Sequence, residues 1–148
     1  MVAPQPFGFL AVLPLVVHGT TYVVDTGGTF GAAVEELKDG DTIQVNRDLT
    51  LNGTMTLKNL MNVTIKSTLG QKYTISGGGV GCFSFVYSSG ISLFDLRVAS
   101  CLNNASPFGG AFYLQGADVT ASNVDTVSNF AHEGSGWYVW KSKLSYKG

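Results

Sequence analysis

The sequence has few charged residues and few histidines. Asp, Glu, Lys and Arg make up 13% of its 148 residues, the net charge is −1, and no stretch clusters lysine and arginine. Neutralising nucleic-acid phosphates requires such clusters, so we do not expect a nucleic-acid partner. The two histidines, His18 and His132, belong to no recognisable metal-ligand set or nucleophile triad. The glycine-rich run at residues 76–81 is no phosphate loop, because no helix is expected after it.

Long helical patterns are also missing, and only one short segment has helical periodicity. In residues 29–38, apolar side chains from Phe30 to Leu37 recur at positions i, i+3, i+4 and i+7. We expect a helix over about residues 29–38, with Thr29 as its N-cap and a stop at the Gly40 turn.

Cysteine is scarce, since the chain contains only Cys82 and Cys101. The two would pair in an oxidising compartment, but the sequence leaves a disulfide and two free thiols equally open. Three glycosylation sequons are consistent with export, at Asn52, Asn62 and Asn104.

The N-terminus carries one apolar run, "FGFLAVLPLVV", from Phe7 to Val17. It is too short to span a membrane comfortably and has the length of the apolar region of a secretory signal peptide, although no Lys or Arg precedes it. We expect residues 1–19 to be a signal peptide cleaved after Gly19. Residues 20–148 would then be a secreted or cell-surface domain without a membrane span. The alternative interpretation is a buried first strand.

The rest of the chain consists of short strand-like runs separated by turn residues. Many short strands at regular spacing predict an all-β fold, either a sandwich, a barrel or a solenoid. The runs begin at Asp41, Leu49, Thr54, Asn62, Tyr73, Cys82, Ile91, Ala111, Asp118, Trp137 and Lys143.

Internal repetition distinguishes between these folds. The stretches "FGGAFYL" (residues 108–114) and "EGSGWYV" (residues 133–139) place a glycine, a small residue and two aromatics in the same order. Equivalent strand positions recur at spacings of 28, 28 and 25 residues, at Val63, Ile91, Val119 and Leu144. A repeat of this length containing two or three strands is typical of one coil of a parallel β-solenoid. We expect about 4–5 coils over residues 41–148.

The last residues, "KLSYKG", follow a strand directly and form no closing element. An open solenoid end exposes unpaired strand edges, so a cap is expected there. The chain is therefore expected to be truncated at the C-terminus, either as a fragment or as the first coils of a longer protein.

Two stretches resemble a known family. "AVEELKDGDTIQV" (residues 33–45) and "LTLNGTMTLKNLMNVTIKS" (residues 49–67) look like the opening of right-handed parallel β-helix proteins of the pectate-lyase-like superfamily. The resemblance implies a right-handed parallel β-helix whose first coil is capped by an amphipathic helix. "GGAF" (residues 109–112) more weakly resembles the GGA repeats of polymorphic outer-membrane proteins, although the accompanying Phe-x-x-Asn motif lacks its asparagine at residues 130–133.

Enzymes of this superfamily are polysaccharide lyases, which use Ca²⁺ and an Arg or Lys base, or hydrolases, which use two or three carboxylates. The carboxylates of the coil region form neither set; they are Asp41, Asp48, Asp95, Asp118, Asp125 and Glu133. We expect an ion pair between Asp125 and Arg97 and a polar turn ladder of Asp95 and Asn123. No catalytic residue or cofactor is therefore assigned, and Ca²⁺ is expected only if the chain is a lyase fragment.

Aromatic residues form the remaining candidate site. The repeat aligns Tyr113 with Phe85 and Leu114 with Val86, and strand alternation separates two faces. If Val86, Leu114 and Val139 point inward, an outward column of aromatic and polar side chains results. It consists of Phe85, Tyr113 and Tyr138, with Tyr87, Gln115 and Trp140 beside it. In the alternative, the parity is reversed and these rings are core.

An exposed stripe of this kind is typical of a binding surface for polysaccharide or for another surface protein. The sequence thus predicts a secreted or surface-displayed β-helix that acts as a non-catalytic binding or structural module. One alternative is a fragment of a polysaccharide lyase or glycoside hydrolase. Another is an adhesin or autotransporter passenger segment.

Overall fold

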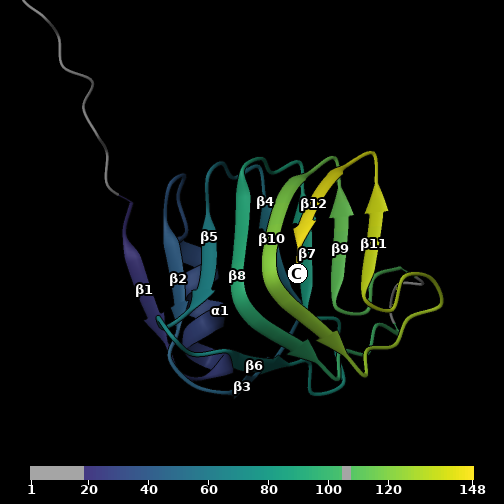
Figure 1. Cartoon of the computed structure of the whole chain (residues 1–148), viewed down its shortest axis with the longest axis horizontal. Coiled ribbons are helices and arrows are strands. Elements are labelled where there is room, and N and C mark those ends of the chain that lie inside the picture. The colour runs from purple at the N-terminus through teal and green to yellow at the C-terminus, as the bar shows by residue number, and fades with distance from the viewer. Residues whose placement is uncertain (1–18, 105–107) are drawn as a thin grey trace, which may run out of the picture.

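The computed structural model describes residues 19–104 and 108–148. Apart from Gly19, the predicted signal peptide lies outside these residues. The described chain is an all-β parallel solenoid of about four turns with one short helix (Figure 1). Its elements are β1 (Thr21–Val24), α1 (Gly27–Glu36), β2 (Thr42–Val45), β3 (Leu49–Thr50), β4 (Met55–Lys58), β5 (Thr64–Ser67), β6 (Tyr73–Ser76), β7 (Phe83–Val86), β8 (Ile91–Ala99), β9 (Phe112–Gln115), β10 (Asp118–Val127), β11 (Trp137–Trp140) and β12 (Lys143–Lys147).

The strands form two parallel sheets. Sheet A follows the order β1-β2-β5-β8-β10-β12, with β3 and β6 beside it, and sheet B follows the order β11-β9-β7-β4. In sheet A, Val119 pairs with Ile91 on one side and with Leu144 on the other, as the repeat predicts. Identical strand positions therefore stack along the solenoid axis, so that each coil extends the sheets of the coil before it.

The helix begins two residues earlier than predicted. Thr26 is the N-cap, and Thr29 closes a reciprocal capping box with it, so the prediction of Thr29 as the cap is wrong. Phe30 and Ala33 are buried, and the Phe30 ring meets the Phe83 ring edge-on at 5.8 Å. The helix thereby covers apolar core at the end of the solenoid that begins with β1, where it contacts β1 and β4 (Figure 1).

Strand β1 precedes the helix and was not among the predicted runs. It pairs in parallel with β2, from Thr21 opposite Thr42 to Val24 opposite Val45. Val24 is buried, whereas Val23, on the opposite side of the strand, is 59% exposed. One further strand is thus added to sheet A ahead of the predicted first coil.

Alternating residues of the strands fill the interior. In sheet A, Ile43, Ile65 and Leu93 pair with one another on successive strands and are fully buried. In sheet B, Leu57 and Leu114 are fully buried in the same way. Each coil thus adds a layer of apolar side chains to one continuous core.

Asp95 and Asn123 mark bends in the two longest strands. Their φ angles are 53° and 54°, in the left-handed region where Asp and Asn are among the better tolerated residues. The Asn123 side-chain amide donates to Asp95 Oδ1 at 2.7 Å. The predicted polar turn ladder is confirmed, and neither residue needs a catalytic role to explain its position.

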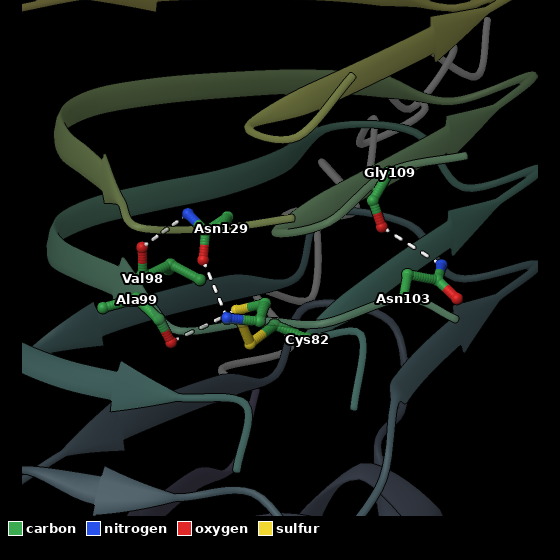
Figure 2. The surroundings of a disulfide bond; sticks show 7 residues. Cys82, Val98, Ala99, Asn103, Gly109 and Asn129 are labelled. Carbon is green, nitrogen blue, oxygen red and sulfur yellow. Dashed lines mark hydrogen bonds between the residues drawn. A yellow bond between two sulfur atoms is a disulfide. The ribbon is translucent and has the colours of Figure 1, made fainter. Parts of the chain in front are cut away.

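Cys82 and Cys101 form a disulfide, with their Cα atoms 5.5 Å apart (Figure 2). Both cysteines are buried. The Asn129 side chain accepts a hydrogen bond from the Cys101 backbone N–H at 2.9 Å and donates to the Val98 carbonyl at 3.0 Å. The bond therefore links the start of β7 to the end of β8 within a hydrogen-bonded corner.

Candidate functional site

The predicted aromatic column is partly right. Tyr113 and Tyr138 lie on the outer face of sheet B, but Phe85 is fully buried, so its assignment to the outer column is wrong. Phe85 pairs with Leu114, and Tyr113 pairs with Ser84. Paired residues of β7 and β9 are thus one position farther apart in the sequence than paired residues of β8 and β10. As a result, the side chains of β7 that the repeat placed outward point inward, and those that it placed inward point outward.

The same one-residue difference in spacing also changes which residues point inward. Leu114 is fully buried, as expected, whereas Val86 lies opposite Gln115 on the outer face. Phe83, Phe85 and Phe112 fill the interior instead, with ring centroids between 5.3 and 6.2 Å apart. The three rings form an aromatic core behind sheet B.

One outward row of sheet B changes from small to large side chains along the solenoid. Thr56, Ser84, Tyr113 and Tyr138 stand opposite one another on β4, β7, β9 and β11. Two hydroxyl side chains are thus followed by two tyrosine rings. The difference in size leaves a step in the surface, with Tyr113 as its wall.

The wall is a stack of aromatic rings. The rings of Tyr113 and Tyr138 are 5.7 Å apart with 5° between their planes. The Phe108 ring also stacks on Tyr138, with a centroid distance of 4.5 Å. Because Tyr138 lies on one side of Tyr113 and Ser84 on the other, the second face of the Tyr113 ring is directed toward Ser84.

A groove of about 360 Å³ occupies the low side of this step. Its volume is at the lower end of ligand pockets, which hold about 300–1,000 Å³. It is lined by Thr54, Thr56, Gly81, Phe83, Ser84, Asn103, Phe108, Gly109 and Tyr113. The groove therefore combines an aromatic wall with short hydroxyl side chains.

Hydrogen bonds fix two of the lining side chains. The Asn103 amide nitrogen donates to the carbonyl oxygens of Phe108 at 2.8 Å and Gly109 at 3.2 Å, and Figure 2 shows the bond to Gly109. The Tyr113 hydroxyl donates to Gln115 Oε1 at 3.1 Å, and Gln115 Nε2 donates to the Tyr87 hydroxyl at 3.2 Å. These bonds restrict the rotamers of the groove before any ligand arrives.

The Tyr113 hydroxyl is neutral, and its surroundings favour the neutral form further. Burial raises the pKa of the Tyr113 hydroxyl above its ordinary value, and the neighbouring Tyr138 and Tyr87 raise this pKa further. The group thus remains a hydrogen-bond donor throughout the physiological pH range.

The other predicted stripe residues extend this face. Tyr87 is 59% exposed, and a Cβ added at Gly116 would come within 2.7 Å of its ring, so Gly116 makes room for it. Trp140 is 44% exposed and pairs beside Gln115, and the Lys141 ammonium lies 4.9 Å from its ring centroid. Five of the six predicted residues, all but Phe85, therefore share one outer surface.

Two of the predicted carboxylates, Asp41 and Asp125, have structural partners. Asp41 accepts backbone N–H bonds from Thr20 at 2.7 Å and from Lys38 at 2.8 Å. Asp125 contacts Lys72 at 2.9 Å and Arg97 at 3.6 Å, so the predicted pair with Arg97 is confirmed. The hydrogen bond from Lys72, aided by the charges of Lys72 and Arg97, lowers the pKa of Asp125 against the opposing effect of burial.

A larger, more open groove of about 760 Å³ lies beside the start of the helix. Asp25, Arg47 and Asp48 are among its lining residues. Asp48 Oδ1 accepts the Thr74 backbone N–H at 2.7 Å, and Asp25 Oδ1 accepts the Thr29 hydroxyl at 3.4 Å. Asp25 thus braces the start of the helix, whereas Asp48 links the residue before β3 to the paired strand β6. Within residues 19–104 and 108–148, no group of three or more His, Cys, Asp or Glu is placed to hold a metal ion.

The three sequons differ in their surroundings. Asn52 and Asn104 are exposed, and the sequon of Asn104 runs into Ser106, outside the described residues. Asn62 is also exposed, but its side chain packs against Gly90, where an added Cβ would clash with Asn62 Oδ1.

The groove itself was not predicted. Thr56 and Ser84 are separated by the 28-residue spacing of the repeat, and this spacing is the sequence feature that could have indicated that they pair. Phe108 and Asn103 lie in a long connection without strand periodicity, so no pattern placed them beside Tyr113.

Comparison with protein-family models, with curated proteins and with solved structures finds no match to this chain. No helix in the described residues has the length and apolar character that crossing a bilayer requires.

Proposed function

We propose that this protein is a secreted or cell-surface module that binds polysaccharide without cleaving it, through the outer face of sheet B. We further propose that it is a divergent member of the pectate-lyase-like β-helix superfamily, on the strength of the solenoid fold and of the resemblance at residues 33–67. The observation that carries the binding proposal is the Tyr113 ring, which has Tyr138 on one face and the groove above Ser84 on the other.

The chemistry of the groove suits a sugar ring. One face of a pyranose ring carries mainly C–H groups and packs on an aromatic face, while its rim carries hydroxyls that both donate and accept hydrogen bonds. Tyr113 supplies the aromatic face, and Thr56 and Ser84 supply hydroxyls that also donate and accept.

The location outside the cell is supported by the disulfide and by the N-terminal sequence. Disulfides persist in oxidising compartments and are rare in the cytosol. The bond between Cys82 and Cys101 is buried and joined to a hydrogen-bonded corner, as a structural disulfide is. The apolar run from Phe7 to Val17 supplies an export signal of suitable length.

The non-catalytic assignment rests on the composition of the groove. Hydrolysis of a glycosidic bond needs a pair of carboxyl groups on either side of it. Among residues 19–104 and 108–148, none of those that line the groove is an Asp or a Glu. A ligand bound there would be held without an acid, a base or a nucleophile.

The proposal is tested by titrating a panel of soluble polysaccharides with the folded protein and measuring heat. We expect binding by the wild-type protein, at least a tenfold loss in Tyr113→Ala, and no change in Phe94→Ala. Phe94 is a matched control because it is an aromatic residue of sheet A with 37% exposure. Reducing-sugar and unsaturated-product assays of the same mixtures, with and without Ca²⁺, are expected to show no cleavage.

Two outcomes would contradict the proposal. Cleavage that depends on Asp25 or Asp48 would make the chain a hydrolase or lyase fragment and move the site to the larger groove. Absence of binding across the panel, by protein whose circular dichroism spectrum shows a folded β-structure, would leave adhesion to a surface protein as the better account.

A further inference from the structure

In the described part of the chain, the residues that line the groove carry no formal charge. Their side chains are hydroxyl, amide and aromatic groups, together with two glycines. The nearest charged residue on β4 is Lys58, which is exposed and belongs to the next outward row, opposite Val86. Trp140 ends that row, and Lys141, the next residue along the chain, lies over the Trp140 ring. Neither lysine lines the groove.

This composition is unfavourable for an acidic polysaccharide. Each uronate carboxylate that entered the groove would lose hydration without gaining a cationic partner, and an unpaired buried charge is costly. Recognition of carboxylates normally uses Arg or Lys in direct contact. A bridging Ca²⁺ would need carboxylate or other oxygen ligands from the protein. Among the described residues that line the groove there is no Asp or Glu, so the charged ligands that usually neutralise Ca²⁺ are missing.

The same composition is favourable for neutral sugars. Thr54, Thr56 and Ser84 each offer one O–H donor and acceptor lone pairs. These groups can exchange hydrogen bonds with sugar hydroxyls in either direction. The Tyr113 hydroxyl is already committed to Gln115, so its ring acts as a stacking surface.

We infer that the groove on sheet B selects neutral polysaccharide over acidic polysaccharide, an inference that rests on the proposed binding function. A sugar ring stacks on the face of Tyr113 above Ser84, and its hydroxyls bond with Ser84 and Thr56. The binding is insensitive to salt, because no ion pair forms. This selectivity is opposite to that of the lyases whose opening sequence the chain resembles.

The test compares a neutral β-glucan or galactan with polygalacturonate at low and high NaCl. We expect the wild-type protein to bind a neutral chain with the same Kd at both salt concentrations, and polygalacturonate at least tenfold more weakly. Ser84→Lys places an ammonium on the floor of the groove. It should weaken neutral binding at least tenfold and create polygalacturonate binding that falls with salt. Thr120→Lys, a matched exposed hydroxyl residue on sheet A, controls for the added charge and should change neither affinity.

The outcomes separate the two claims. If polygalacturonate binds more tightly than every neutral chain, depends on Tyr113 and is released by salt, the groove is acidic-selective; the inference is then overturned while the binding function stands. If neither class binds to folded protein, the binding function fails and the inference fails with it. A Ser84→Lys variant that behaves like Thr120→Lys would also overturn the inference, because it would place the sugar elsewhere.

Discussion

Tyr113 and Tyr138 stack face to face across adjacent coils, with their ring centroids 5.7 Å apart. Parallel pairing of β9 with β11 places the two residues directly opposite each other. Because Tyr138 covers one face of Tyr113, the face that remains is directed toward Ser84 and the groove. Tyr138 therefore orients the ring that we propose contacts the sugar.

A double-mutant cycle tests this stack. Tyr113→Ala and Tyr138→Ala should each lower the free energy of unfolding, and the coupling between them should be about 0.5–1.5 kcal/mol, the usual worth of an aromatic pair beyond its buried area. Urea denaturation of the four proteins measures it. A coupling near zero would mean that the two rings do not support each other in solution.

Truncation of Phe85 is expected to lower the stability of the fold strongly, because Phe85 is a core residue. Its side chain is fully buried against Phe83 and Phe112, so Phe85→Ala should cost about 3–5 kcal/mol of stability. Phe94→Ala, on an aromatic residue with 37% exposure, should cost much less. Chemical denaturation compares the two. A Phe85→Ala protein as stable as Phe94→Ala would place Phe85 on the surface, where the sequence pattern first put it.

The repeat made most of the fold predictable. Each predicted strand run overlaps a strand of the structure, although β8, β10 and β12 extend beyond their predicted ends, and Ile91, Val119 and Leu144 pair as the spacings require. Such registers can be read from a sequence because parallel coils place equivalent residues directly above one another, and the same side-chain size is selected at each layer. The corner residues Asp95 and Asn123 were recognised for the same reason, as their ladder follows the repeat.

The parity of β7 could not be predicted because it depends on a change in loop length. The connection from Phe85 to Ile91 is one residue longer than that from Leu114 to Val119. A shift of one residue turns a strand over and exchanges its two faces.

The position of the helix N-cap was predicted wrongly for a different reason. Thr26 and Thr29 both have the side chain of an N-cap, and only the reciprocal bonds between them show which one precedes the helix.

Removal of the disulfide should be destabilising. Cys82 and Cys101 are 19 residues apart, and closing a loop of this size stabilises a fold by about 3 kcal/mol. The double variant Cys82→Ala/Cys101→Ala should therefore unfold at lower urea concentration, as should the wild-type protein under reductant. Thiol labelling of the unfolded wild-type protein supplies the control. Two free thiols in protein purified from an oxidising compartment would contradict the pairing.

Substitution of Gly110 tests how closely the coils pack at the repeated glycine motif. An added Cβ at Gly110 would clash with the Ser135 carbonyl oxygen of the next coil, which is backbone and cannot move aside. Gly110→Ala should cost about 1–3 kcal/mol, as overpacking does. Gly53→Ala is the control, because nothing lies within 4 Å of its added Cβ. Equal midpoints in thermal or urea unfolding would show that the coils are not packed as closely as the structure has them.

The most direct measurement of the central claim is NMR chemical-shift mapping of the labelled protein during titration with a neutral oligosaccharide. We expect the backbone signals of Thr56, Ser84 and Tyr113 on sheet B to shift together and to saturate, while those of Thr42, Thr64 and Thr120 on sheet A stay in place. Shifts confined to sheet A or to the groove beside Asp48, or no shifts at saturating sugar, would contradict the account.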